Sequence, residues 1–439
     1  MGWTQLALLM SVLAQPAPWS LDDCLRHCLA NHPDLRVAQS GVAGARARQR
    51  IARSTYLPQL FVESSDSQFF IGRQEAVYVD GSEVPYERDA YSDDLHGFGI
   101  HLRQPVFDGL AYWHRPRQAA AELDRAELDV ELTREQLVLA VIEAYYRLLG
   151  QRRVERVLVE ALAVSRAQLE LASERHRLGA ASKVDVSRAR LAVGEDRIAL
   201  ERQRMTAAQG LAALNQAMGR TPGAALELSE EGAAAGAPAG DLEPQLAQVN
   251  RRLRRNRLDE AIAEREIEIA AAGLWPSVTA SAAYTRQDPE FYKVYSRFDR
   301  LYRMTLSLGI SFPIFEGFAT QGRIEVAEAQ LERVRAERTQ LRRQLETALF
   351  QSRTEVRQLA AVESIERGNI RAAEHALELA REQYRLGQGT ALEVRDAQLA
   401  VRRTRVEHIQ TRYDLRIALA AYHRARGDLL QTYLPEERP

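Results

Sequence analysis

Four potential metal ligands lie close together near the start of the chain, at Cys24, His27, Cys28 and His32. If this segment is helical, the four side chains share one face, and thiolates and imidazoles are the groups that bind Zn²⁺. A single helix cannot surround an ion with four tetrahedral ligands, however, and a Cys24–Cys28 disulfide inside a helix would be strained. We therefore expect two small packing residues and no metal site.

Nothing else in the chain suggests catalysis. The sequence has no phosphate-binding glycine loop, no CxxC motif and no evident pairing of a nucleophile with a base, and its other histidines are scattered. The net charge of −1, with arginines interleaved among glutamates, provides no general attraction for nucleic acid. The sequence therefore predicts a protein that is not an enzyme and that needs no cofactor.

The feature that organises the chain is an internal repeat with an offset of 208 positions. The heptapeptide that starts at Ser173 and ends at Gly179 has its counterpart around Arg385, Leu386 and Gly387. The same offset aligns two further motifs, which we place at junctions between a strand and a helix: Pro105, Phe107, Asp108 and Gly109 with Pro313, Phe315, Glu316 and Gly317. A repeat of this length indicates that one supersecondary unit has been duplicated.

The start of the chain is typical of an export signal. Residues 6–13 form a short apolar segment, and Ala14 follows at a plausible cleavage position, so we assign residues 1–14 as a signal peptide. No other segment approaches the 18 or so consecutive apolar residues of a spanning helix. If the protein crosses a membrane, it does so as strands.

Candidate strands occur in both halves. Apolar and small or polar residues alternate strictly from Met304 to Ile314, and residues 98–106 show the same alternation apart from Gln104. Weaker strands are predicted at 59–71 and 277–287, with hairpin loops that are acidic at 80–83 and aromatic at 291–295. About ten residues with one apolar face suit a tilted strand that crosses a bilayer. Two hairpins on a water-soluble helical body are the alternative, but isolated hairpins are marginally stable.

Four strands cannot close a barrel, and an open sheet edge is not tolerated in lipid. A membrane location therefore requires oligomerisation, and a threefold assembly would give twelve strands.

Two very long helices are predicted, from Gly109 to Gly179 and from Gly317 to Gly387. Each contains 70 steps, or about 105 Å at 1.5 Å per residue. A return helix follows each, up to Gly219 and Gly427, and medium helices precede the strands at about 21–56 and 243–274. The fold class is mainly α with a small β portion. The predicted domains are a first repeat at 15–218, an irregular linker rich in Gly, Ala and Pro at 219–243, a second repeat at 244–432 and a tail at 433–439.

With these motifs in place, the chain resembles TolC-type outer membrane efflux proteins, the outer membrane factor family. The resemblance rests on Asn31-His32-Pro33-Asp34-Leu35, the Leu57-Pro58-Gln59-Leu60 helix end, the two junction motifs and the two Arg-Leu-Gly turns. It implies a homotrimer with a twelve-stranded β-barrel in the outer membrane of a Gram-negative bacterium and an α-helical tunnel in the periplasm. It also implies an exit duct for efflux or type I secretion, with a periplasmic adaptor and an inner-membrane pump or ABC transporter as partners.

The resemblance further implies a gate at the periplasmic turns. It places acidic or tyrosine gate positions at Asp185, Tyr384, Glu393 and Asp396, and adaptor-docking tips at Leu178, Gly179, Leu386 and Gly387. The family's gating arginine corresponds to Gly389, so the usual arginine lock is absent at that position, and Arg385 and Arg395 are candidate substitutes.

Two interpretations of the acidic residues stay open. Threefold symmetry would make rings of Glu393 and Asp396 that bind cations and repel anions. Alternatively, these are ordinary acids at helix starts, and Asp185 follows Ser182 in the pattern of a capping box. A periplasmic coiled-coil scaffold or adaptor without a barrel is the rival class for the whole protein, although it would not need the doubled junction motif.

Overall fold

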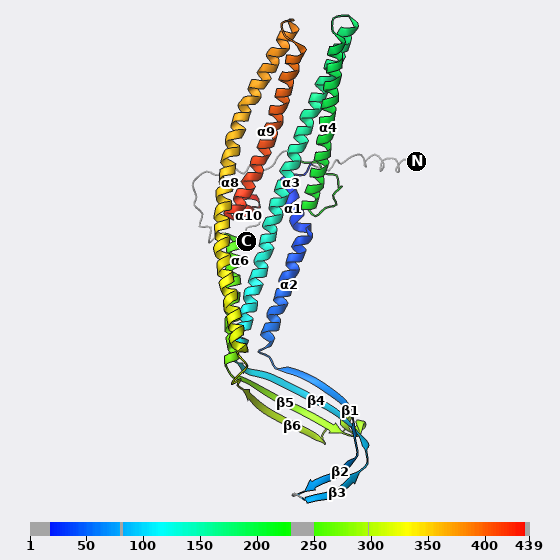
Figure 1. Cartoon of the computed structure of the whole chain (residues 1–439), viewed down its shortest axis with the longest axis vertical. Coiled ribbons are helices and arrows are strands. Elements are labelled where there is room, and N and C mark those ends of the chain that lie inside the picture. The colour runs from blue at the N-terminus through cyan, green and yellow to red at the C-terminus, as the bar shows by residue number, and fades with distance from the viewer. Residues whose placement is uncertain (1–17, 80–81, 230–249, 297, 435–439) are drawn as a thin grey trace, which may run out of the picture. The chain divides into compact units, whose positions relative to one another are not determined.

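The computed structural model describes residues 18–79, 82–229, 250–296 and 298–434 (Figure 1). The chain divides into two compact units, one made of residues 1–40, 127–255 and 338–439 and the other of residues 41–126 and 256–337. The predicted signal peptide at 1–14, most of the predicted linker and the last residues of the predicted tail lie outside the described part.

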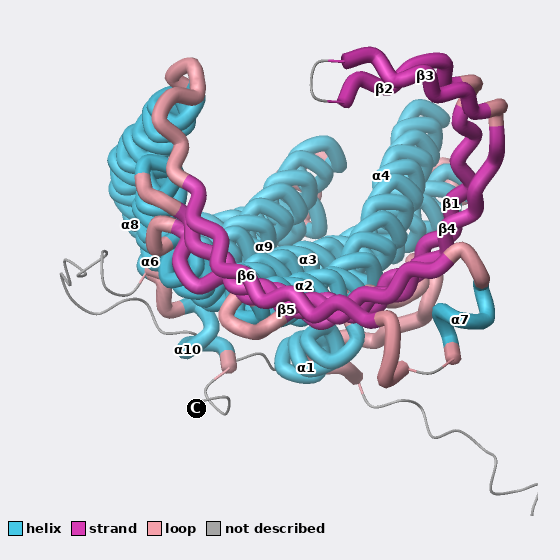
Figure 2. Tube along the Cα trace, turned by 90° about the horizontal axis from the view of Figure 1, so that it is seen from below, coloured by secondary structure: helices cyan, strands magenta, loops and turns pink. Residues whose placement is uncertain are grey.

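The second unit contains a four-stranded antiparallel sheet with the order β1-β4-β5-β6. Its strands are β1 (Gln59–Ile71), β4 (Tyr91–Asp108), β5 (Ser277–Asp288) and β6 (Tyr302–Ser311). Figure 2 shows them as one curved ribbon of strands. The helices of this unit include the end of α2 (Pro33–Ser54), α6 (Arg251–Ala271), the 3₁₀ turn η1 (Ala272–Leu274) and the beginnings of two long helices, α3 and α8.

The sheet has one apolar and one polar face, as the alternation in the sequence predicts. The register pairs Leu60 with Leu102, Leu102 with Ala282, and Ala282 with Leu306, so these side chains share a face. The large apolar residues on this face are exposed in the single chain: Leu60, Val62, Ile100, Leu102, Met304, Leu306, Leu308 and Ile310. The opposite face carries mainly small and polar residues, among them Ser281, Thr285, Thr305 and Ser307. Such a sheet is suited to lipid on one side and water on the other.

Exposed aromatic residues lie at both ends of the apolar face. Trp113, Trp275, Phe315 and Phe318 flank the ends of the strands that join the helices, and Phe70, Tyr292, Phe298 and Tyr302 flank the opposite ends. Trp and Tyr concentrate where hydrocarbon meets water. Aromatic residues at these positions would mark the two boundaries of a lipid-facing region.

Both hairpin loops contain structure that the sequence analysis did not predict. In the first, β2 (Gln74–Val79) and β3 (Ser82–Arg88) form a second hairpin, so residues 82–83 of the expected loop belong to a strand, and residues 80–81 lie outside the described part. The expected loop at 291–295 is a short helix, α7 (Phe291–Tyr295). The buried Arg286 supports this second loop, because its Nη2 donates to the carbonyl oxygens of Lys293 (2.7 Å) and Ser296 (2.8 Å). The prediction for the last strand was wrong beyond Ser311, where β6 ends two residues before Pro313, which has no backbone N–H to donate.

The two junction motifs share one backbone conformation. Gly109 and Leu110 have φ of 68° and 71°, and Gly317 and Phe318 have φ of 60° and 66°, so each junction makes two consecutive left-handed residues. The acid before each glycine supports the helix that follows: Asp108 Oδ1 accepts from the Tyr112 N–H (2.8 Å) and Glu316 Oε2 from the Thr320 hydroxyl (2.7 Å). The motif therefore serves to turn the chain sharply from strand to helix.

The first unit consists of helices, and the two long ones confirm the predicted lengths. Its elements are α1 (Leu21–Asn31), the beginning of α2, most of α3 (Ala111–Arg177), α4 (Lys183–Ala217), most of α8 (Ala319–Arg385), α9 (Ala391–Arg426) and α10 (Leu429–Tyr433). Of the medium helix predicted at 243–274, residues 251–271 form α6 and 272–274 form η1, whereas 243–249 lie outside the described residues. No helix in the described ranges is both long enough and apolar enough to span a membrane.

The core of this unit surrounds α1 and the middle of α3. Tyr145 is fully buried and donates to the carbonyl oxygen of Ser229 (2.6 Å). Cys24 and Cys28 lie in the same apolar cluster, and Cys28 Sγ lies 3.3 Å from the carbonyl oxygen of Ala217. Burial raises the pKa of Cys24 to about 12 and that of Cys28 to about 11, so both thiols are protonated at neutral pH. Their surroundings are those of packing residues.

Gly109 and Gly317 provide a matched test of the junction. A Cβ on Gly109 would lie 2.2 Å from the carbonyl oxygen of Ala272, whereas a Cβ on Gly317 would meet no atom within 4 Å. Gly317→Ala should therefore cost only the left-handed conformation, about 1–2 kcal/mol, and Gly109→Ala should cost clearly more. Thermal unfolding of the detergent-purified proteins would measure both, and equal losses would contradict the proposed close approach to Ala272.

Candidate functional site

The two turns between paired helices have the same geometry. Gly179 after α3 and Gly387 after α8 have φ of 76° and 75°. The next residue in each turn, Ala180 or Gln388, donates its N–H back to a carbonyl of the last helical turn, at 2.8 and 2.9 Å. This is the Schellman arrangement that closes helix C-termini. The leucine before each glycine is exposed to solvent in the single chain, Leu178 to 72% and Leu386 to 61%.

Two of the predicted gate acids cap the return helices. Asp185 Oδ2 accepts from the N–H (3.1 Å) and hydroxyl (2.8 Å) of Ser182, and these bonds lower the pKa of Asp185. Glu393 accepts from the N–H of Thr390 (2.9 Å) in the equivalent box of α9. Asp396 is exposed one turn further along α9. Within one chain, Asp185 and Glu393 therefore act as capping residues at the N-termini of α4 and α9.

Tyr384 joins the two helical hairpins. The hydroxyl of Tyr384, on α8, accepts from Arg175 Nη1 on α3 at 2.8 Å. The Arg175 guanidinium carbon also lies 5.2 Å from the centre of the tyrosine ring. This contact lies within two turns of both tips, so it ties the ends of the hairpins together.

A second contact between the hairpins is a buried ionic cluster around Asp196 on α4. The Asp196 side chain is 1% exposed, and both of its oxygens accept from Arg395 on α9, at 3.1 and 3.2 Å. Arg402, two turns further along α9, also donates to Asp196 Oδ1. Bidentate arginine–carboxylate pairs are among the stronger polar contacts in proteins. One carboxylate thus holds two guanidinium groups of the other hairpin.

The two candidate substitutes for the missing arginine have different partners. Arg385 pairs with Glu382 in its own helix (2.7 Å), whereas Arg395 crosses to Asp196. Of the two substitutes, Arg395 is therefore the one that links the hairpins.

The backbone around Gly389, the position of the missing arginine, is crowded. A Cβ there would lie 3.2 Å from both Gln383 Cβ and the Tyr384 nitrogen.

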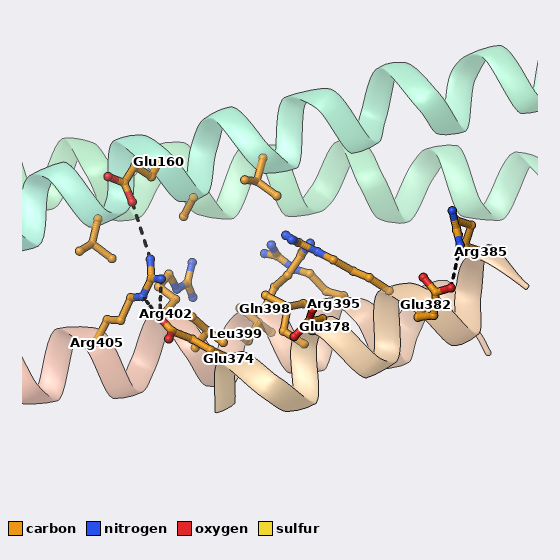
Figure 3. Close-up of a pocket in the computed structure, with 16 residues that line it drawn as sticks. Glu160, Glu374, Glu378, Glu382, Arg385, Arg395, Gln398, Leu399, Arg402 and Arg405 are labelled. Atoms are coloured by element: carbon orange, nitrogen blue, oxygen red, sulfur yellow. Dashed lines mark hydrogen bonds and ion pairs between the residues drawn. The ribbon is translucent and has the colours of Figure 1, made fainter. Parts of the chain in front are cut away.

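Between the hairpins lies a groove of about 710 Å³ that is lined by both charged and apolar side chains, drawn in Figure 3. Arg405 on α9 bridges it, with Nη1 3.8 Å from Glu160 Oε2 on α3 and Nη2 2.5 Å from Glu374 Oε1 on α8. Arg395 and Arg402 also line this groove. Charged contacts therefore join the hairpins along several turns of α9 and not only at the tips.

Comparison with known proteins decides the family. The model of the family described as "Outer membrane efflux protein" matches residues 24–220 and 242–428, which together include most of the chain. The chain belongs to the outer membrane efflux protein family. The break in the match, residues 221–241, falls within the predicted linker.

Curated relatives and solved structures agree with this assignment. Protein CyaE of Bordetella pertussis is 25% identical over 424 residues, covering 94% of this chain and 84% of that protein. The outer membrane protein VceC of Vibrio cholerae is 19% identical, and its structure gives a TM-score of 0.78. The superposition covers 93% of this chain and 96% of VceC. The structure of CusC gives a TM-score of 0.80 at 17% identity, covering 93% of this chain and 92% of CusC. The fold is therefore that of TolC-type channels.

The efflux protein is an outer membrane channel that extends into the periplasm, as the family and these relatives establish. The rival class, a periplasmic scaffold without a barrel, is not favoured. The family consists of channel proteins and not of enzymes.

Sequence analysis missed Asp196, Arg402 and Arg175, although one signal was present. At the offset of 208, Asp196 corresponds to Thr404, Arg395 to Ser187 and Arg402 to Gly194, so each charge occurs in only one copy of the repeat. Charges that break the repeat are candidates for contacts between the copies. Their spatial proximity could not be inferred from spacing.

Removing the Asp196 carboxylate should loosen the contact between α4 and α9. Asp196→Ala leaves two guanidinium groups without their buried partner, and breaking a buried pair costs about 3 kcal/mol. Hydrogen exchange should report faster opening of the amides around residues 196 and 395–402. Glu195→Ala is the control, because Glu195 is exposed and lies 3.7 Å from Arg395, and its loss should cost less than about 0.5 kcal/mol. Equal exchange in the two variants would contradict a structural role for Asp196.

Proposed function

We propose that this channel is a homotrimer whose periplasmic end is held closed by the contacts between the two hairpins of each chain. Trimerisation is supported by the sheet, because β1 and β6 are its edge strands and have no further strand partner among the described residues. Three copies joined edge to edge would give twelve strands and remove every edge from the lipid. The apolar face would then be turned to lipid and the face with Ser281, Thr285, Thr305 and Ser307 to the lumen.

The observation that carries the proposed gate is the Asp196 cluster together with the Arg175–Tyr384 bond. Each connects residues about 200 positions apart in sequence, one on each hairpin. Opening a tube of helices at its end requires neighbouring hairpins to separate or slide. Contacts of this kind must then break or exchange partners, so they oppose opening.

Asp185, Tyr384, Glu393 and Asp396 are assigned to this gate with different roles. Tyr384 takes part in a bond between hairpins, and Asp185 and Glu393 hold the return helices in their capped conformation. Asp396 is exposed, and threefold symmetry would make it an acidic ring that binds cations. Glu393 would contribute to the same ring through the carboxylate oxygen that Thr390 does not use.

The docking partner is proposed to be a periplasmic adaptor that brings an inner-membrane efflux pump or ABC transporter to the channel. The tips offer Leu178-Gly179 and Leu386-Gly387, and the two leucines are the bare apolar groups there. Two equivalent apolar tips per chain suit a partner that itself ends in a helical turn with an apolar residue. One relative is named for its cargo: OpmQ of Pseudomonas aeruginosa, a pyoverdine export outer membrane protein, is 27% identical over 276 residues that cover 60% of this chain and 55% of OpmQ.

Loss of the Tyr384 contact should open the channel. Arg175→Ala removes the donor that crosses between hairpins, so single-channel conductance in planar bilayers should rise severalfold. The matched control is Arg385→Ala, which removes an arginine of the same tip that pairs within its own helix and should leave conductance unchanged. Similar conductance in wild type and Arg175→Ala would remove this contact from the gate.

A charge at the tips should prevent docking without opening the channel. The double variant Leu178→Asp and Leu386→Asp should abolish co-purification with the adaptor and export in cells, because an apolar contact is replaced by a charged group. Leu379→Asp, on α8 two turns before the tip and also exposed, is the control and should keep both. If the double variant still assembles and exports, the tips are not the docking site.

A further inference from the structure

A basic and aromatic groove lies where α2 ends and α3 begins, in the unit that carries the sheet. It has a volume of about 600 Å³, and its lining includes Arg53, Tyr56, Leu57, Trp113 and Arg117. The side chains of Trp113 and both arginines are exposed. The groove contributes nothing to the contacts between hairpins, so the proposed gate does not account for it.

The two arginines of the groove have no acidic partner within the described ranges. Arg117 donates from Nη1 to the carbonyl oxygen of Trp113 (3.1 Å), and its guanidinium carbon lies 4.1 Å from the centre of the Trp113 ring. The lining contains no carboxylate. Neighbouring arginines behave differently, since Arg48 lies 3.8 Å from Glu122 and Arg115 lies 3.5 Å from Asp108. The groove therefore presents two positive charges that lack a counterion.

The groove also lies at a membrane boundary. Tyr56 and Leu57 immediately precede β1, and Trp113 lies five residues after β4 ends, within the band of aromatics on the helical side of the sheet. Gln104, at the end of the apolar face of β4, is 3.4 Å from the carbonyl oxygen of Tyr56. The apolar face of the sheet thus continues to the rim of the groove. Because the helices extend into the periplasm, this is the periplasmic leaflet.

We propose that this groove binds the headgroup of an anionic phospholipid of the periplasmic leaflet. The phosphate would accept hydrogen bonds from Arg53 and Arg117, since guanidinium groups bind phosphate in a bidentate manner. Trp113 and Tyr56 would lie at the level of the glycerol backbone, as such side chains do at membrane interfaces. The acyl chains would cover the apolar face of the sheet beside Leu60 and Leu102. The occupant is a lipid and not a free anion, because the charged groove opens onto this apolar surface.

Native mass spectrometry of the intact protein with added phosphatidylglycerol tests the site. The wild type should bind phosphatidylglycerol more tightly than phosphatidylcholine with the same acyl chains. The double variant Arg53→Gln and Arg117→Gln should weaken phosphatidylglycerol binding by about tenfold or more, since each basic residue near an anionic surface contributes about 1 kcal/mol. Arg53→Lys with Arg117→Lys keeps the charge but not the bidentate geometry, so it should retain part of the preference. It also guards against misfolding of the first variant.

The control is Arg36→Gln, an exposed arginine earlier in the same helix α2, which should bind phosphatidylglycerol as the wild type does. The proposal is overturned if the protein shows no preference for phosphatidylglycerol or if the glutamine double variant, correctly assembled, binds it normally. It is also overturned if inorganic phosphate displaces the lipid at similar concentrations, because the groove would then be a general anion site. Normal conductance of the double variant would separate this site from the gate.

Discussion

The constraint on which the architecture depends is that a backbone hydrogen-bonding group cannot be left unpaired in hydrocarbon. A sheet of four strands has an edge at β1 and another at β6, and lipid offers neither edge a partner. Only further strands can satisfy them, and the sheet is too small to close upon itself. In the proposed trimer, copies of the chain would therefore share one closed sheet, and each strand that leaves it at the junctions would continue as a helix. The helices would then form a ring because the strands do.

The junctions translate that ring of strands into a ring of helices. Each uses an acid, a glycine and two left-handed residues, and the conformation is the same at Gly109 and Gly317 although their surroundings differ. Two consecutive residues with left-handed backbone conformation turn the chain from strand to helix at each junction. The direction of each helix is therefore fixed relative to the strand before it. Flexible linkers at these points would leave the helices free to splay. This requirement explains why the motif occurs at both junctions.

Much of the fold could be predicted from sequence because its determinants are local. Gly179, Gly219, Gly387 and Gly427 end their helices with positive φ, and Pro58 marks the start of a strand. The sheet follows from alternation on one lipid-facing surface. Helix α7 was missed because its loop is held by contacts such as those of Arg286 with the carbonyl oxygens of Lys293 and Ser296, which no periodicity encodes. For the same reason, sequence analysis found the acids that cap α4 and α9 but missed Asp196, whose partners lie about 200 residues away.

The single-copy charges around Asp196 have a mechanical consequence for the proposed trimer. Two hairpins per chain would place six nearly equivalent hairpins around the axis, with six seams between them. Three seams lie inside a chain and carry the Asp196 cluster, whereas the other three lie between chains and are built from different residues. If stiff and compliant seams alternate around the ring, it would widen by movement at the three seams between chains. The duplication would thus give six similar hairpins around the axis. Because the charges of the Asp196 cluster occur in only one copy of the repeat, the opening motion would have threefold symmetry.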